Sequence, residues 1–203
     1  MVAQISRSPV KGFRLRHPDE VQLGVDGVPG NRRFFVIGSD GARLRGSRTP
    51  WLSLVAADPM SALAGSPVRL VRADHLAAVA NAPATLVSDG SLARFAAAAG
   101  ADGVDARRFR MLFELAGCQP HEEDDWEGRC FSIGSAVVRV GAGVDRCAVT
   151  TRDPETAVRD LDTLRVLADY RGRRASDGAV LFGVYATVEA PGRVRVGDAI
   201  EPA

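Results

Sequence analysis

The amino-acid sequence predicts a β-rich α+β fold with a barrel-like sheet and a few helices. Three observations support this. From Ala3 to about Val71, short apolar runs alternate with clusters of Gly, Pro, Asp and Asn, which is typical of strands joined by tight turns. Two later stretches carry helix signals, and alternating apolar residues return near the C-terminus. A chain of 203 residues suits one domain, or a main domain with a small N-terminal subdomain.

The expected strands are short apolar runs bounded by turn residues. In chain order they are VQLGV, RFFVIG, WLSLV and VRLVRA, then FSIG and AVVRVG, and finally LFGVYATVEAPGRVRVG. The first helix is expected over 91–101, with Ser88 or Asp89 as N-cap. The second is expected over 159–171, where three leucines fall on one face. A glycine follows each helix and can end it.

Composition and charge exclude several classes of partner. The chain has 26 basic and 25 acidic residues, which gives no reason to expect a nucleic acid or an anionic membrane. No apolar run approaches the roughly 18 residues that a spanning helix needs. The start of the chain lacks the layout of a secretory signal, which predicts a cytoplasmic location. Three cysteines without paired spacing predict reduced thiols rather than disulfides or a structural zinc.

Cys147 is the candidate reactive residue. It lies in VDRCAVTT, next to Arg146 and close to Arg152. A neighbouring guanidinium favours the thiolate, which is the form that binds metals and attacks electrophiles. The alternative is a small apolar residue buried on a strand, since free cysteine is among the most buried residue types.

Several cations are candidate anion ligands. Lys11, in SPVKGF, could anchor an anion or could simply be solvated. Arg32 and Arg33 follow the turn GVPGN, and on a strand one of them would point inward and need an anionic partner. The same reasoning applies to Arg108 and Arg110, which we expect to share a strand face.

The acidic segment 122–125 could in principle form a hard-metal or general-acid cluster beside His121 and Trp126. Adjacent carboxylates on a loop cannot all converge on one ion, so we expect a solvated, negatively charged surface instead. The sequence contains no nucleophile elbow, P-loop, dinucleotide-binding fingerprint or paired zinc ligands. The enzyme classes that depend on those motifs are therefore disfavoured.

An ordered set of segments runs almost from end to end of the chain. In order they are SPVKGF, GVPGNRRFFVIGSDG, SRTPWLSLV, VSDGSLARF, RRFRML, EEDDW, DRCAVTTRDPET, LRVLADYR, FGVY and PGRVRVGDAI. Together they resemble the MOSC domain family, which includes the C-terminal part of molybdenum cofactor sulfurases, bacterial MOSC proteins and amidoxime reducing components. The resemblance implies a MOSC-type β-barrel over 76–203, preceded by a small β-rich N-terminal subdomain over 1–75.

The resemblance also implies a site. Cofactor-bearing members hold molybdopterin between the two parts, with a cysteine thiolate on molybdenum, and Cys147 matches that ligand. By motif position, Lys11, Arg32 and Arg110 match cations that contact the phosphate and edges of the cofactor. Thiolate is a suitable ligand for a thiophilic metal, and guanidinium and ammonium groups suit a phosphate.

The function that this resemblance implies is the reduction of a small N-hydroxylated or N-oxide compound by a molybdenum-dependent oxidoreductase. Electrons would come from a separate redox partner protein, since the sequence carries no flavin, haem or iron–sulfur motif. One alternative is a carrier that holds the cofactor, or a persulfide sulfur on Cys147, without turnover. Another is a molybdenum-independent enzyme of secondary metabolism that uses Cys147 as a nucleophile or for sulfur transfer.

The chain departs from the family pattern at four places. Gly12 stands where serine is usual, Asn31 replaces aspartate, and Met111 and Leu112 replace Pro-Asn. Segment 81–83 also lacks a pair of hydroxyl residues. Each replacement can remove a hydrogen bond worth about 1 kcal/mol, so we expect fewer polar contacts to molybdopterin than in those relatives.

Overall fold

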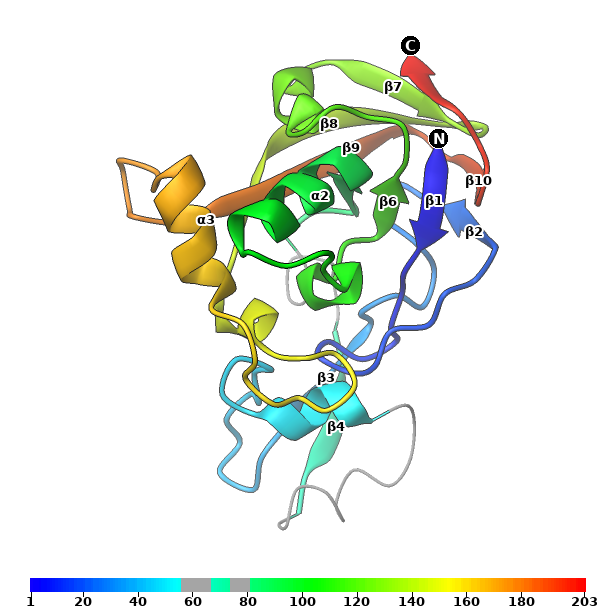
Figure 1. Cartoon of the computed structure of the whole chain (residues 1–203). Helices are drawn as coiled ribbons and strands as arrows, with labels where there is room; N and C mark the ends of the chain where they lie inside the picture. Colours follow the sequence, from blue (N-terminus) through cyan, green and yellow to red (C-terminus); the bar gives the residue numbers. More distant parts are fainter. Residues whose placement is uncertain (56–66, 74–80) are drawn as a thin grey trace.

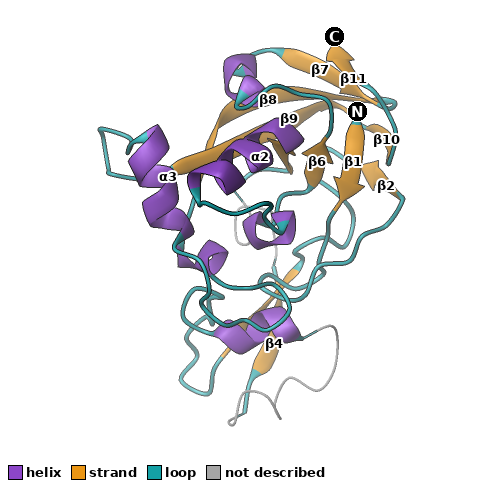
Figure 2. Ribbon diagram, in the orientation of Figure 1, coloured by secondary structure: helices purple, strands orange, loops and turns teal. Residues whose placement is uncertain are grey.

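The computed structural model describes residues 1–55, 67–73 and 81–203. A seven-stranded sheet curls into a nearly closed barrel, and helices α2 and α3 pack beside it (Figures 1 and 2). The predicted β-rich α+β class is therefore confirmed. In chain order the elements are β1 (Val2–Ile5), β2 (Glu20–Leu23), β3 (Phe34–Ile37), η1 (Pro50–Leu54), β4 (Arg69–Arg72), β5 (Ala84–Ser88), α2 (Asp89–Ala98), η3 (Ala106–Phe109), β6 (Phe113–Leu115), η4 (Glu122–Trp126), β7 (Cys130–Ile133), β8 (Ala136–Asp145), η5 (Ala148–Thr151), α3 (Thr163–Arg171), β9 (Leu181–Ala190), β10 (Gly192–Arg195) and β11 (Ile200–Pro202).

The strand order of the main sheet is β1-β6-β5-β9-β8-β7-β11. Every neighbouring pair is antiparallel except β5 and β6, which run parallel. Two further pairs, β10 with β2 and β3 with β4, form small antiparallel sheets. Both β1 and β2 contribute to the main core, so residues far apart in the chain share it. The predicted boundary between residues 75 and 76 lies outside the described residues and stays a prediction.

Three apolar clusters stabilise the fold. The largest fills the barrel, and a second packs α2 and α3 on the sheet through Phe95, Phe109 and Phe182. A third, smaller cluster lies around β3 and η1, with Val36 and Leu52 at its centre. We call the part of the molecule around this third cluster the β3–β4 lobe; in Figure 1 it lies below the barrel. The candidate site lies where this lobe meets the barrel.

Both predicted helices are present, and one begins later than expected. The Ser88 hydroxyl accepts a hydrogen bond from Ser91 N at 3.0 Å and caps α2, as predicted. Helix α3 begins at Thr163 rather than at residue 159. Its cap is the Asp162 carboxylate, while Asp160 N donates to the Thr151 carbonyl at 3.2 Å and holds the preceding residues in a loop.

Two strand predictions are wrong. WLSLV belongs to the 3-10 helix η1, because Pro50 at its start has the fixed φ of a helix N-terminus and no N–H for a strand ladder. Arg108 and Arg110 do not share a strand face either. Arg108 lies within the 3-10 helix η3, and Arg110 follows it in a left-handed conformation with φ of 55°, so the two side chains diverge.

In the described part of the chain, no helix is both long and apolar enough to cross a membrane.

Gly90 allows α2 to pack closely on the loop after β6. A Cβ at this position would lie 2.4 Å from the Cys118 carbonyl oxygen and 2.7 Å from Gln119 C, both of them backbone atoms. We expect Gly90→Ala to lower the free energy of unfolding by about 2 kcal/mol, because backbone must shift to relieve the overlap. Urea denaturation measures this. Gly103→Ala is the control, since a Cβ there meets nothing within 4 Å.

Candidate functional site

Cys147 is exposed and lies directly after β8, as the N-cap residue of η5. The alternative of a cysteine buried on a strand is therefore wrong. The chain turns away from the sheet here because hydroxyl groups close a short helical turn. Thr150 Oγ1 donates to the Cys147 carbonyl at 3.0 Å, and Thr151 Oγ1 donates to the Ala148 carbonyl at 2.8 Å. The turn presents the thiol at the surface.

Three cations lie around Cys147, and a fourth, Arg32, is bonded to the backbone of one of them. Burial is the main cause that lowers the pKa of Lys11, Arg110 and Arg146, and Cys147 contributes in the opposite direction, so all three lie within electrostatic reach of its sulfur. Arg32 in turn lowers the pKa of each of these three cations. The fold thus brings together the four residues that the resemblance singled out, and adds Arg146. We call Lys11, Arg32, Arg110 and Arg146 the cation cluster.

Two hydrogen bonds, one donated from each side, join the β3–β4 lobe to the barrel at this cluster. Arg32 Nη2 donates to the Arg110 carbonyl at 2.7 Å, and Arg110 Nη2 donates to the Phe13 carbonyl at 2.6 Å. Both arginines have positive φ, at 49° and 55°. Such backbone conformations are uncommon for residues other than glycine and concentrate at functional sites.

Lys11 is held by backbone contacts of its own loop. Its N–H donates to the Phe34 carbonyl at 2.8 Å, and Arg32 N donates to the Ser8 carbonyl at 2.6 Å. The Asn31 side-chain oxygen accepts from Ser8 N at 3.0 Å. Segment SPVKG therefore lies against the end of the GVPGN turn, which places Lys11 and Arg32 side by side.

The sequence identifies Arg146 only as a neighbour of Cys147, but in the structure its side chain also makes several hydrogen bonds. Its guanidinium donates to the carbonyls of Phe182, at 2.9 Å, and Phe109, at 2.8 Å, and to Met111 Sδ at 2.7 Å. Burial lowers the pKa of Arg146 to about 10. The side chain therefore points inward and fixes the segment that leads to Arg110.

The cation cluster carries positive charge that no carboxylate of the described residues pairs with. Among the described residues, none of its four members forms an ion pair within 4 Å, and the guanidinium groups donate to carbonyls and one thioether. Burial first, and then Arg32, lowers the pKa of Arg110 to about 9. A bound anion would relieve this unfavourable burial of charge. The donor set, one exposed thiol among cations, fits a phosphate-bearing cofactor whose metal accepts a thiolate.

The structure explains why some of the expected polar contacts are missing. The side-chain oxygen of Asn31 already accepts a hydrogen bond from Ser8 N. Gly12 has φ of +98°, a conformation that a serine would adopt only with strain. Met111 accepts from Arg146, and Leu112 is buried in the main core. Any cofactor here would therefore depend more on charge than on side-chain hydroxyl groups.

Arg43 and Arg45 were not predicted as part of the site, although both lower the pKa of Lys11. Arg43 also lies over the ring of Phe35, 4.4 Å from its centroid. The two arginines come from a polar loop, SDGARLRG, without periodicity or motif spacing. No signal in the sequence links that loop to Cys147.

The acidic segment only partly forms the solvated surface that was expected. Glu123 is 0% exposed and accepts hydrogen bonds from the hydroxyls of Ser88 and Ser91, both at 2.7 Å. Asp124 forms an ion pair with Arg171 at 2.6 Å. Within residues 1–55, 67–73 and 81–203, no group of three or more His, Cys, Asp or Glu could hold a metal ion. The acidic segment is thus structural.

The charge of Lys11 makes anion binding sensitive to pH. Burial, together with Arg43 and Arg32, lowers the pKa of Lys11 from 10.5 to about 8. Because the folded pKa lies below that of the unfolded chain, the charge of Lys11 costs stability below pH 8, and this cost disappears as pH rises toward 10.5. Sulfate, whose own charge is constant, should bind several times more weakly at about pH 8.5 than at about pH 6.5. Calorimetric titration measures this, and in Lys11→Met the change should be much smaller.

Comparison with solved structures supports the fold. The YUAD protein of Bacillus subtilis superposes with a TM-score of 0.55 and 14% identity, covering 98% of this chain and 92% of that one. YiiM from Escherichia coli superposes with a TM-score of 0.51 and 14% identity, covering 97% and 69%. At such low identity these likenesses concern the fold alone.

Sequence comparison shows the family. Mitochondrial amidoxime reducing component 2 of Homo sapiens is 40% identical over 98 residues, which cover 45% of this chain and 29% of that protein. Mitochondrial amidoxime-reducing component 1 of Homo sapiens is 33% identical over 103 residues, covering 48% and 30%. The chain thus matches less than a third of the length of these relatives. The profile of the MOSC domain matches residues 65–201, which is more than half of the chain. By this match, with the barrel and the ordered motifs around Cys147, the chain belongs to the MOSC domain family.

Proposed function

We propose that this protein binds the molybdenum cofactor through Cys147 and reduces small N-hydroxylated or N-oxide compounds. The single observation that best supports this is the cation cluster around an exposed thiol, with no carboxylate paired to its members among the described residues. Two relatives named amidoxime reducing components, 40% and 33% identical over about half of the chain, supply the substrate class.

The residues of the site would have different roles in holding the cofactor. Cys147 would hold the metal, because its thiol is exposed at the start of η5 and lies within electrostatic reach of three cations. Lys11, Arg32 and Arg110 would hold the phosphate and the pterin edges from the lobe and barrel sides. Arg146 would position the Arg110 segment through its bonds to the Phe109 carbonyl and Met111.

The cofactor would supply the two-electron redox chemistry, and the substrate N–O bond would be cleaved. The balance is one N–OH group, two electrons and two protons giving N–H and water. The protons can come from solvent, which reaches the exposed Cys147. The electrons must come from another molecule, and a partner redox protein is the source that we propose. A cytoplasmic location stays a prediction.

A second candidate function is supported by the exposure of Cys147. A thiol at the surface can be reached by another protein, so the same site could carry the cofactor, or a persulfide sulfur, and pass it on without turnover. The cation cluster would stabilise a bound anion equally well in that case. Turnover, not binding, therefore separates the two functions.

Protein from a host that makes the cofactor tests both proposals. Molybdenum is measured by elemental analysis, the pterin by its fluorescence after oxidation, and turnover with an aryl amidoxime and a chemically reduced dye as electron donor. Molybdenum, pterin and turnover together support the oxidoreductase. Molybdenum and pterin without turnover of any N-hydroxylated or N-oxide compound support the carrier. Absence of both molybdenum and pterin contradicts the cofactor in either function.

A further inference from the structure

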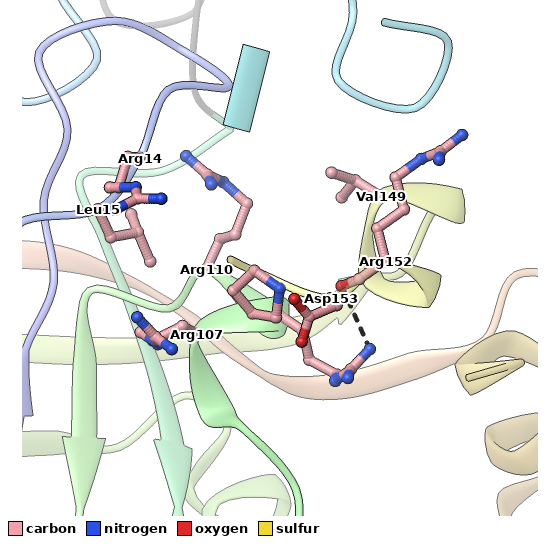
Figure 3. Close-up of a pocket in the computed structure, with 9 residues that line it drawn as sticks. Arg14, Leu15, Arg107, Arg110, Val149, Arg152 and Asp153 are labelled. Atoms are coloured by element: carbon pink, nitrogen blue, oxygen red, sulfur yellow. Dashed lines mark hydrogen bonds between the residues drawn. The ribbon is translucent and has the colours of Figure 1, made fainter. Parts of the chain in front are cut away.

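A pocket rich in arginine opens beside the cation cluster. It is an open depression, and about 450 Å³ of space lies between its lining residues, including the part open to solvent. Arg14, Leu15 and Arg107 lie on one side of it, Val149, Arg152 and Asp153 on the other, and Arg110 between them (Figure 3). We call it the arginine pocket. Arg110 belongs both to this pocket and to the cation cluster, so the two are continuous.

Carboxylates already neutralise three of the arginines. Glu155 forms ion pairs with Arg14, at 3.1 Å, and with Arg107, and Asp160 pairs with Arg108 at 3.0 Å. The ion pairs of Glu155 tie the loop after η5 to the side of the pocket formed by Arg14 and Arg107. Arg14, Arg107 and Arg108 are therefore paired with carboxylates of the protein, and a ligand could reach their charge only by displacing those carboxylates.

The remaining two arginines of the pocket have no such partner. Within the described part of the chain, Arg110 donates to the Phe13 carbonyl, Arg152 Nη1 donates to the Ala157 carbonyl at 3.0 Å, and neither forms an ion pair. The Nε atom of Arg152 is buried and makes no hydrogen bond to the described residues. The carboxylate of Asp153 accepts from Thr156 N and Glu155 N, so it is engaged in its own turn.

We propose that the arginine pocket binds an anionic group, a carboxylate or a phosphate-like group, on the small molecule that is held near Cys147. This rests on the proposed function and names the substrate class further: N-hydroxylated compounds that carry an acidic group. Arg152 is the cation that the anion meets, and Arg110 is the residue that the pocket shares with the proposed cofactor site. Guanidinium groups bind both kinds of oxyanion through paired hydrogen bonds.

The shape of the pocket suits such a molecule. Leu15, Val149 and Pro154 add apolar surface between the charged groups, against which an aryl or alkyl body can pack. Val149 lies in η5, two residues after Cys147, and Arg110 is within electrostatic reach of the thiol. The lining of the pocket thus includes two residues, Val149 and Arg110, that connect it with the Cys147 region.

Glu155 sets how strongly the pocket attracts anions. It is an exposed residue whose carboxylate forms ion pairs with both Arg14 and Arg107. An incoming anion competes with it for both, since one carboxylate can replace another at a guanidinium group. Removing its charge therefore strengthens anion binding, which is the opposite of the effect of removing the charge of Arg152.

Binding of three matched ligands tests the proposal: an aryl amidoxime, the same compound with a para-carboxylate, and the same compound with a para-phosphonate. Calorimetry is carried out on full-length protein isolated with and without cofactor. We expect the two anionic ligands to bind about tenfold more tightly than the neutral one. Arg152→Gln should lose most of this preference, and Glu155→Gln should increase it. Arg165→Gln, the same charge change on the exposed face of α3, should keep it unchanged.

The outcomes separate this proposal from the proposed function. The proposed role of the pocket is overturned if neutral and anionic ligands bind equally well. It is also overturned if Arg152→Gln and Arg165→Gln lose the same share of the preference for anionic ligands. A preference for anionic ligands that appears only in cofactor-free protein also overturns it, because the anions would then be binding in the place of the cofactor. Absence of turnover with all three ligands, while the preference persists, contradicts the oxidoreductase and leaves the pocket supported. A higher affinity for carboxylate or for phosphonate identifies the anion.

Discussion

Cys147→Ala is expected to lose molybdenum and turnover while keeping the fold and stability of the native protein. The thiol is exposed and makes no cap hydrogen bond, so its removal should change the free energy of unfolding by no more than about 0.5 kcal/mol. The same change removes the proposed metal ligand, and we expect turnover of an amidoxime to fall by about a thousandfold or more. Elemental analysis, urea denaturation and initial rates measure the three quantities.

Two controls make this expectation specific. Cys130→Ala removes a thiol that lies on β7, away from the cation cluster, and should retain molybdenum and turnover. Cys147→Ser keeps the size of the side chain but replaces soft sulfur with oxygen, so it should bind molybdenum poorly. Full molybdenum content and full activity in Cys147→Ala would show that the chemistry is centred elsewhere.

Glu123→Ala is expected to destabilise the protein by about 3–4 kcal/mol, which would be the largest stability effect of any change considered for this chain. Glu123 is completely buried and accepts from the hydroxyls of Ser88 and Ser91 and from Ser88 N at 3.3 Å. The residue reaches from η4 to the N-terminus of α2, where its carboxylate also favours the positive end of the helix. Alanine would leave a small cavity and buried donors without acceptors.

Urea denaturation of matched variants measures the effect. Glu127→Ala changes the same residue type at an exposed position close in sequence, and should stay within about 0.5 kcal/mol of the native value. Glu123→Gln keeps one acceptor and should fall between the two. A native stability for Glu123→Ala would mean that the network contributes nothing to holding η4 on α2.

The parts of the fold that could be predicted depend on local signals. Helix α2 was predicted with its cap because Ser88, the following alanines and Gly100 all act within one segment. Most strands were found for the same reason, since alternation and turn residues are local. Helix α3 was placed with the wrong start, because a contact with Thr151 decides where it begins.

The site is less visible in sequence because it is assembled from distant segments. Ordered motifs pointed to Cys147 and to the three cations from Lys11 to Arg110, and the fold brings these residues together. The inward contacts of Arg146 are with Phe182, Phe109 and Met111, which lie far from it in the sequence. The burial of Glu123 likewise depends on α2. Sequence alone gives such residues no distinguishing pattern, since their role comes from tertiary packing.

The hydrogen bonds from Arg32 to the Arg110 carbonyl and from Arg110 to the Phe13 carbonyl also affect how the two parts of the molecule can move. Each arginine holds a carbonyl of the opposite part, Arg110 on one side and Phe13 on the other, so the β3–β4 lobe is tied to the barrel by two short contacts. An anion bound among the cations would add a further link across the same seam and would have to be released before the lobe could separate. Amide hydrogen exchange in β3 should therefore slow when ligand binds, with the retardation tracking ligand occupancy.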